Sequence, residues 1–107
     1  MFLGRGEGDF SSGMRVIEVK HIEDCVDGSS IREFVLDGEI TKDFVDRSSQ
    51  FAEKVQYFGG LERPFFKLET AGRFIVKGVE GNCTLRVTVR GREKAEIEAT
   101  LIREMGR

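Results

Sequence analysis

The longest amphipathic pattern in the chain runs from Ile40 to Phe58. Apolar or small residues recur there at steps of three or four, in the series Ile40, Phe44, Ser48, Phe51, Val55 and Phe58. This spacing places them along one side of an α-helix. The pattern therefore predicts one long helix, about residues 39–58, with a single buried side. Asp37 is the expected N-cap, and Gly59-Gly60 is the expected end of the helix.

Shorter alternating patterns on both sides of this segment predict β-strands. They cover residues 14–21 and 31–36 before it, and residues 64–70, 73–78 and 83–89 after it. Alternation of apolar, often β-branched residues with polar ones is typical of half-buried strands. Glu80-Gly81-Asn82 predicts a hairpin turn between the last two runs. The pattern also predicts that Val76 lies opposite Leu85 in this hairpin.

Residues 93–105 carry two conflicting signals. Four apolar residues alternate as in a strand, namely Ala95, Ile97, Ala99 and Leu101, whereas the abundance of Glu, Ala, Lys and Leu favours a helix. We expect a C-terminal helix. The alternative is an edge strand that extends the sheet between two copies of the chain. The predicted fold is thus α+β, with the long helix packed on a mainly antiparallel sheet of four to six strands.

The composition indicates one small domain outside the membrane. The chain has 107 residues, of which 39% are hydrophobic and 34% charged, and it contains no apolar run of the ~20 residues that a membrane span needs. Residues 1–13 combine four glycines with no period, which predicts a disordered leader before a single domain over 14–107. Two cysteines and no secretory signal favour a cytoplasmic protein.

The sequence offers little catalytic chemistry. It contains no GxGxxG, P-loop or GxSxG motif, and its densest group of potential ligands surrounds His21, the only histidine. One histidine and two cysteines fall short of the four ligands of a structural zinc site, so we expect no metal and no cofactor. Cys83 shares the phase of Leu85 and is expected to be buried, and the acidic neighbours of Cys25 disfavour a thiolate. We therefore expect no catalytic residues and favour a protein that is not an enzyme.

A first candidate binding site is the segment of residues 57–66, in which aromatic residues surround two glycines. Its candidate ligand or partner residues are Tyr57, Phe58, Gly59, Gly60, Arg63 and Phe65. A pocket here is the basis for one alternative function, a small-ligand-binding protein or an enzyme that also uses His21 or Cys25. The competing interpretation is that Phe58, Phe65 and Phe66 fill the core where the helix meets the sheet.

A second candidate is an anion-binding face on the outer side of the sheet. It consists of Arg73, Lys77, Arg86 and Arg90. Residues 1–62 contain 7 basic and 13 acidic residues, whereas residues 63–107 contain 10 basic and 6 acidic ones. The order helix, three strands, helix from Ile40 onward is similar to that of double-stranded RNA-binding domains, although Arg92-Glu93-Lys94 replaces the Lys-Lys run at the start of the last helix. Nucleic-acid binding is therefore an alternative function, and a solvated face of alternating charge is the competing explanation.

The sequence favours a small cytosolic interaction or self-association module. The expected partner is another protein or a second copy of the chain, with RNA as the alternative and no contact with a membrane.

Overall fold

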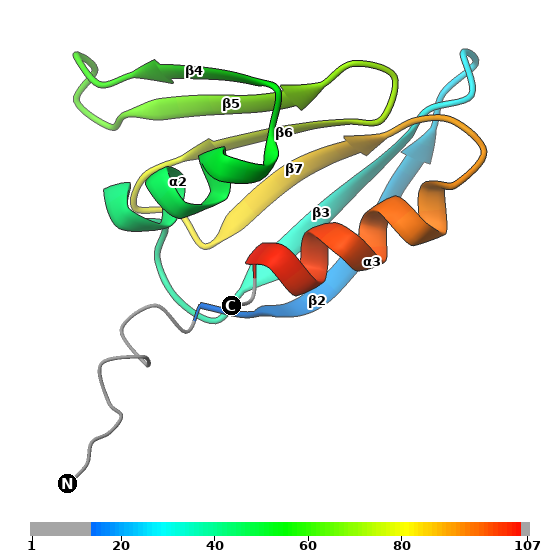
Figure 1. The fold of residues 1–107 in the computed structure, drawn as a ribbon. Helices are drawn as coiled ribbons and strands as arrows, with labels where there is room; N and C mark the ends of the chain where they lie inside the picture. Colours follow the sequence, from blue (N-terminus) through cyan, green and yellow to red (C-terminus); the bar gives the residue numbers. More distant parts are fainter. Residues whose placement is uncertain (1–13, 106–107) are drawn as a thin grey trace, which may run out of the picture.

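An antiparallel sheet of six strands carries both helices on one side (Figure 1). The structure is a computed structural model, and it describes residues 14–105. The elements in chain order are β2 (Val16–Asp24), β3 (Ser30–Leu36), α2 (Lys42–Ser48), the 3₁₀ turn η1 (Ser49–Phe51), β4 (Lys54–Phe58), β5 (Phe65–Thr70), β6 (Phe74–Val79), β7 (Thr84–Val89) and α3 (Lys94–Met105). The strand order in space is β2-β3-β7-β6-β5-β4. The α+β class and the antiparallel sheet are confirmed, and the predicted leader lies outside the described residues.

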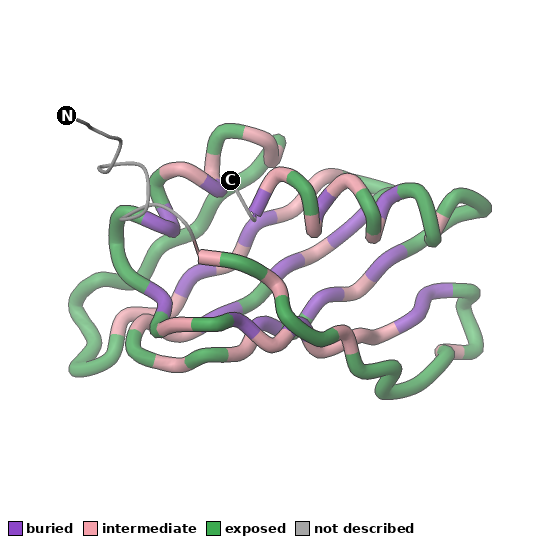
Figure 2. Tube along the Cα trace, turned by 90° about the horizontal axis from the view of Figure 1, so that it is seen from below, coloured by how far each residue is buried: buried purple, intermediate pink, exposed green. Residues whose placement is uncertain are grey.

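The core lies between the sheet and the two helices. Buried positions alternate along the strands (Figure 2), as expected for a sheet that is covered on one side. The strands contribute Phe34, Leu36, Phe66, Leu68, Phe74, Val76, Leu85, Val87 and Val89, and the helices contribute Phe44, Val45, Ile97, Leu101 and Met105. Phenylalanine and leucine thus fill most of the space under the helices.

Within residues 14–105, no helix covers the other side of the sheet, which we call the open face (Figure 1). The registers of the strand pairs place on it Glu18, Lys20, Glu23, Ile31, Glu33, Val35, Lys54, Gln56, Phe58, Phe65, Lys67, Glu69, Ile75, Lys77, Val79, Thr84, Arg86 and Thr88. This face mixes charged, aromatic and β-branched side chains.

The prediction of one long helix over residues 39–58 is wrong. Helix α2 covers only Lys42–Ser48, and its N-cap is Thr41, whose Oγ1 accepts a hydrogen bond from the Phe44 N–H at 3.1 Å. Asp37, the expected N-cap, instead accepts a hydrogen bond from the N–H of Arg15, next to the start of β2, at 2.9 Å. The N-cap therefore lies four residues later than the sequence pattern suggests.

Local chemistry at the end of α2 explains why the helix stops. The hydroxyl of Ser49 donates to the carbonyl of Val45 at 2.7 Å, a bond that weakens helices. Ala52 is already extended, with φ −109° and ψ 148°. The next residues, Lys54–Phe58, are rich in β-branched and aromatic side chains and pair with β5 over their full length. The apolar spacing of residues 51–58 fits a helix, but Val55 and Tyr57 also fit the period of a strand.

The C-terminal half follows the sequence pattern more closely. Residues 94–105 form α3, which confirms the C-terminal helix, and the alternative edge strand over 93–105 is wrong. The β6–β7 hairpin is shifted by two residues from the predicted register, because Val76 lies opposite Val87 rather than Leu85. The connection contains four residues, 80–83, where the predicted pairing left room for only two. With β4, four strands now lie between the helices, so the similarity to double-stranded RNA-binding domains does not extend to the strand count.

Candidate functional site: the open face and edge strand β4

The residues around His21 form a polar cluster at one end of the β2–β3 hairpin. The Ser30 hydroxyl donates to Oδ1 of Asp24 at 2.8 Å, and Nε2 of His21 lies 3.0 Å from the same oxygen. The hydrogen bond from Ser30, followed by that from His21, lowers the pKa of Asp24 below its ordinary value. A catalytic triad needs Ser and Asp on opposite nitrogens of the His ring, whereas here both contact Nε2 and Ser30 is fully buried. The cluster therefore stabilises the hairpin.

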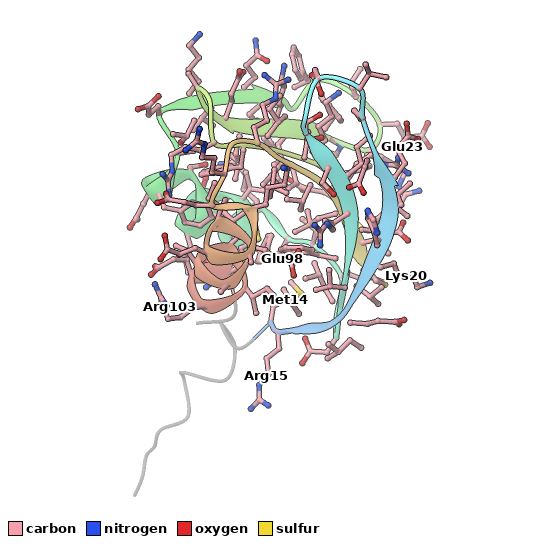
Figure 3. The ribbon with its side chains drawn as sticks, turned by 90° about the vertical axis from the view of Figure 1, so that its right-hand side faces the viewer. Met14, Arg15, Lys20, Glu23, Glu98 and Arg103 are labelled. Carbon is pink, nitrogen blue, oxygen red and sulfur yellow. The ribbon has the colours of Figure 1, made fainter. Side chains whose placement is uncertain are left out.

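The same cluster continues to helix α3. Nε of Arg32 donates to Oγ of Ser30 at 3.2 Å, and its Nη1 donates to Oε1 of Glu98 at 2.7 Å. Both members of this ion pair are only about one-fifth exposed, at 23% and 21%. Glu98 points from α3 toward the sheet in Figure 3. Hydrogen-bonded charges in this position join the C-terminal helix to β3.

The thiols and potential metal ligands are dispersed. Within residues 14–105, no three His, Cys, Asp or Glu side chains come close enough together to hold a metal ion. Cys25 is half-buried, but Cys83 is exposed, contrary to our expectation, because it precedes the first residue of β7 and lies in the connecting turn. His21 and Phe58 lie on opposite edge strands, five strand spacings or about 24 Å apart. A pocket that combines the 57–66 segment with His21 or Cys25 is therefore not formed.

The aromatic residues of the 57–66 segment separate onto two sides of the sheet. Tyr57 lies on the helix-covered side, where its hydroxyl donates to Oε2 of Glu80 at 2.6 Å and Nζ of Lys42 lies 5.0 Å from its ring centroid. Phe58 and Phe65 lie on the open face with their ring centroids 5.7 Å apart. Phe58 is 46% exposed. The interpretation that these two rings fill the core is therefore wrong.

The remaining residues of that segment hold the β4–β5 connection in place. Arg63 donates a hydrogen bond to Oδ1 of Asn82, in the β6–β7 turn. The ring of Tyr57 folds over Gly59 so closely that a Cβ there would lie 2.6 Å from the Tyr57 Cε2. Gly60 has open space around it. Tyr57 and Arg63 thus both attach the β4–β5 hairpin to the turn between β6 and β7.

The contact with Glu80 predicts a raised pKa for Tyr57. The hydrogen bond to the carboxylate is the largest cause and desolvation the next, and together they raise the pKa from 10.0 to about 12. A tyrosine is charged above its pKa, so the raised value stabilises the folded state below pH 10, and this contribution is lost between about pH 10 and 12. Tyr57 is the only tyrosine, so the absorbance of phenolate in a pH titration reports it alone.

We expect a midpoint near pH 12 in the native chain and a clearly lower midpoint in Glu80→Ala, because this variant removes the largest cause of the raised pKa. Glu62→Ala, which removes another acidic residue from the same end of the sheet, is the control and is expected to leave the midpoint unchanged. A native midpoint near 10 in folded protein would show that the contact does not form in solution.

The structure brings together two of the four residues predicted to bind anions. Lys77 and Arg86 lie directly opposite each other on the open face. Arg73 lies beyond them, 3.9 Å from Glu93, and lines a hollow on the helix side of the sheet. Arg90 follows the last residue of β7, and its N–H donates to the carbonyl of Arg73 at 2.8 Å. The predicted face is therefore divided between the open face and the sheet end.

Sequence reasoning missed a third member of this group, Lys67. It lies on β5 directly opposite Lys77. We call Lys67, Lys77 and Arg86, on three adjacent strands, the cationic row. The signal was present in the run Phe66-Lys67-Leu68, because two inward apolar residues force the residue between them outward.

Two shallow depressions lie beside the cationic row. One, of about 290 Å³, is lined by residues that include Phe65, Lys77 and Arg86, together with the acidic residue Glu33. The other, of about 340 Å³, is lined by Lys54, Val55, Gln56, Lys67 and Glu69. Nζ of Lys67 lies 3.9 Å from Glu69, whereas neither Lys77 nor Arg86 forms an ion pair with any residue between 14 and 105. The row thus presents cationic groups to the solvent.

The two edges of the sheet differ in how they are protected. Strand β2 has two register shifts against β3, between Val16 and Glu18 and between His21 and Glu23. Strand β4 pairs with β5 over all five residues without a shift, and each of its residues is exposed. Irregularities twist an edge away from other strands. Strand β4 lacks them, and half of its backbone N–H and C=O groups point away from β5.

Comparison of the chain with models of protein families, with curated proteins and with solved structures found no match. Neither helix in the described part of the chain has the length and apolar character needed to cross a bilayer.

Proposed function

We propose that this domain is a small interaction module that pairs with a second copy of itself through edge strand β4. The observation that carries the proposal is the regular and exposed edge of β4, on which Lys54 is the one charged residue. Natural sheets protect their edges with bulges, charges, prolines or covering segments. Strand β4 has no register shift, and Val55 and Phe58 are 45% and 46% exposed on it.

The sequence of β4 is self-complementary in an antiparallel pairing. When two copies meet about a two-fold axis at Gln56, all five residues of each strand find a partner. Val55 of one copy then lies opposite Tyr57 of the other on the helix-covered side. On the open face Lys54 lies opposite Phe58, which allows a cation–π contact. Each such cross-strand pair contributes about 0.2–1 kcal/mol.

The pairing joins two six-stranded sheets into one sheet of twelve strands. Because each copy contributes only five residues to the contact, the contact area is small and the dimer is expected to dissociate on dilution. Backbone hydrogen bonds supply most of the attraction, and the alternating side chains determine the register. A reversible equilibrium that depends on protein concentration is the expected behaviour.

Sedimentation equilibrium over a wide range of protein concentration tests this proposal. The native chain, 12.1 kDa as a monomer, is expected to approach twice that mass as its concentration rises. Val55→Lys is expected to remain monomeric, because a charge on an edge strand opposes pairing. The matched control is Ile17→Lys, which likewise replaces a β-branched apolar residue by lysine, at a 62% exposed position of the other edge strand, β2.

Circular dichroism establishes that both variants are folded. We expect Ile17→Lys to dimerise like the native chain. A native chain that stays monomeric at every concentration, or a dimer that Val55→Lys leaves intact, would refute the pairing through β4.

A further inference from the structure

We infer that the part of the open face formed by β4–β7 binds single-stranded nucleic acid. The cationic row contacts phosphates, and Phe58 with Phe65 provides a surface on which bases stack. This inference goes beyond self-association, because one copy of the chain carries the complete site.

The first argument is the arrangement of like charges. Lys67, Lys77 and Arg86 lie directly opposite one another across three adjacent strands. Neighbouring strands are ~4.8 Å apart, so the row extends over about 10 Å. Like charges directly opposite in a sheet are destabilising. An anion bound along the row would relieve the repulsion between these three groups, which Glu69 beside Lys67 and Glu33 opposite Arg86 offset only in part.

The second argument is that the open face has two electrically different parts. Its β4–β7 part carries Lys54 and the cationic row against a single acidic residue, Glu69. Its β2–β3 part carries three acidic residues, Glu18, Glu23 and Glu33, against Lys20. Glu33 marks the boundary between the two parts, because it lies directly opposite Arg86. Lys20 and Glu23 point away from α3 in Figure 3, as residues of this face should. Attraction for a polyanion is therefore confined to β4–β7, although the chain as a whole has a net charge of −2.

The third argument distinguishes a nucleic acid from an acidic peptide. The rings of Phe58 and Phe65 are tilted by only 30° to each other, and Phe65 lines the same depression as Lys77 and Arg86. Aromatic rings beside cationic groups on an exposed sheet are the arrangement that stacks unpaired bases while their phosphates are neutralised. Acidic peptides need the cations but not the rings. The face of a six-stranded sheet is also too broad to enter the groove of a duplex, which admits a helix or a two-stranded ribbon.

The test is a fluorescence-anisotropy titration of a labelled oligouridylate, about 20 nucleotides long, at several salt concentrations. Saturable binding that weakens with salt is expected. Removing two phosphate contacts in Lys77→Ala/Arg86→Ala is expected to lower the slope of log affinity against log salt by about 1.4. Arg15→Ala/Arg103→Ala is the matched control, because it removes the same charge from two exposed cations outside the open face (Figure 3).

A second variant tests the stacking surface. Phe58→Leu keeps an apolar side chain but removes the ring, and it is expected to weaken binding about 5- to 150-fold with an unchanged salt slope. A duplex of the same length and an oligoglutamate peptide are the competing ligands, and neither is expected to bind as well.

Four results would overturn the inference. The first three are absence of binding at low salt, equal losses of affinity in both double variants, and equal affinity for the duplex. The fourth is binding of oligoglutamate that Phe58→Leu weakens as much as it weakens binding of the oligonucleotide. Self-association is measured in a separate experiment, as the mass of the protein without ligand. Failure of the dimer and failure of the nucleic-acid site are therefore separate outcomes.

Discussion

Replacing Phe44 with alanine is expected to lower the free energy of unfolding by about 3–5 kcal/mol. Phe44 is completely buried, and with Val45 it holds a helix of only seven residues against the sheet. A helix of that length has no stability of its own in water, so its attachment depends on this packing. Loss of the ring leaves a cavity and weakens the connection between β3 and β4.

Urea unfolding followed by circular dichroism measures this effect. All variants are compared at one protein concentration, because association with a second copy adds to the apparent stability. Gln50→Ala is the control from the adjoining turn, where the side chain is exposed, and a change within about 0.5 kcal/mol is expected. A loss below about 1 kcal/mol for Phe44→Ala would show that α2 does not cover the core as described.

Gly78→Ala is expected to destabilise the fold by about 1–3 kcal/mol, because it overfills the core. A Cβ at this position would lie 2.7 Å from Cε1 and Cζ of Phe66 and 2.7 Å from Cδ2 of Leu85. Phe66 is completely buried and Leu85 is 1% exposed, so neither has space into which it moves freely. Glycine is therefore needed here because of close packing rather than because of its backbone angles.

A double-mutant cycle separates this packing effect from a loss of strand propensity. In a Phe66→Leu background the ring is absent, and Gly78→Ala is expected to cost clearly less than it does in the native chain. Gly60→Ala, at a glycine with nothing within 4 Å of the added Cβ, is the control for substitution itself. Equal costs of Gly78→Ala in both backgrounds would contradict the predicted clash.

The parts of the fold that the sequence predicts are those in which one period dominates. Strands β5, β6 and β7 alternate clearly, so their positions follow from local pattern. For α3 the period suggested a strand, and only the composition of the segment favoured the helix that forms. Residues 51–58 fit two periods at once, and the outcome depends on pairing with β5, which is a tertiary interaction. The extended backbone at Ala52 marks the point at which the chain leaves the helical conformation and continues toward strand β4.

The candidate site was only partly predictable for a similar reason. Lys77 and Arg86 belong to one hairpin, so a local turn is enough to bring them together. Lys67 joins them only when β5 is aligned with β6, and that alignment is a tertiary interaction. The ion pair between Arg32 and Glu98 spans 66 positions in the sequence, and no local pattern indicates it.

The position of β3 beside β7 has a consequence for synthesis of the chain. Ser30 pairs with Val89, so β3 finds its second neighbour only after 59 further residues have been added. At translation rates of about 5–20 residues per second, that interval is roughly 3–12 seconds. During this time the β2–β3 hairpin exposes Phe34 and Leu36, which are buried in the finished domain. The nascent chain therefore carries an apolar strand that is paired along one edge only until nearly the whole domain has been synthesised.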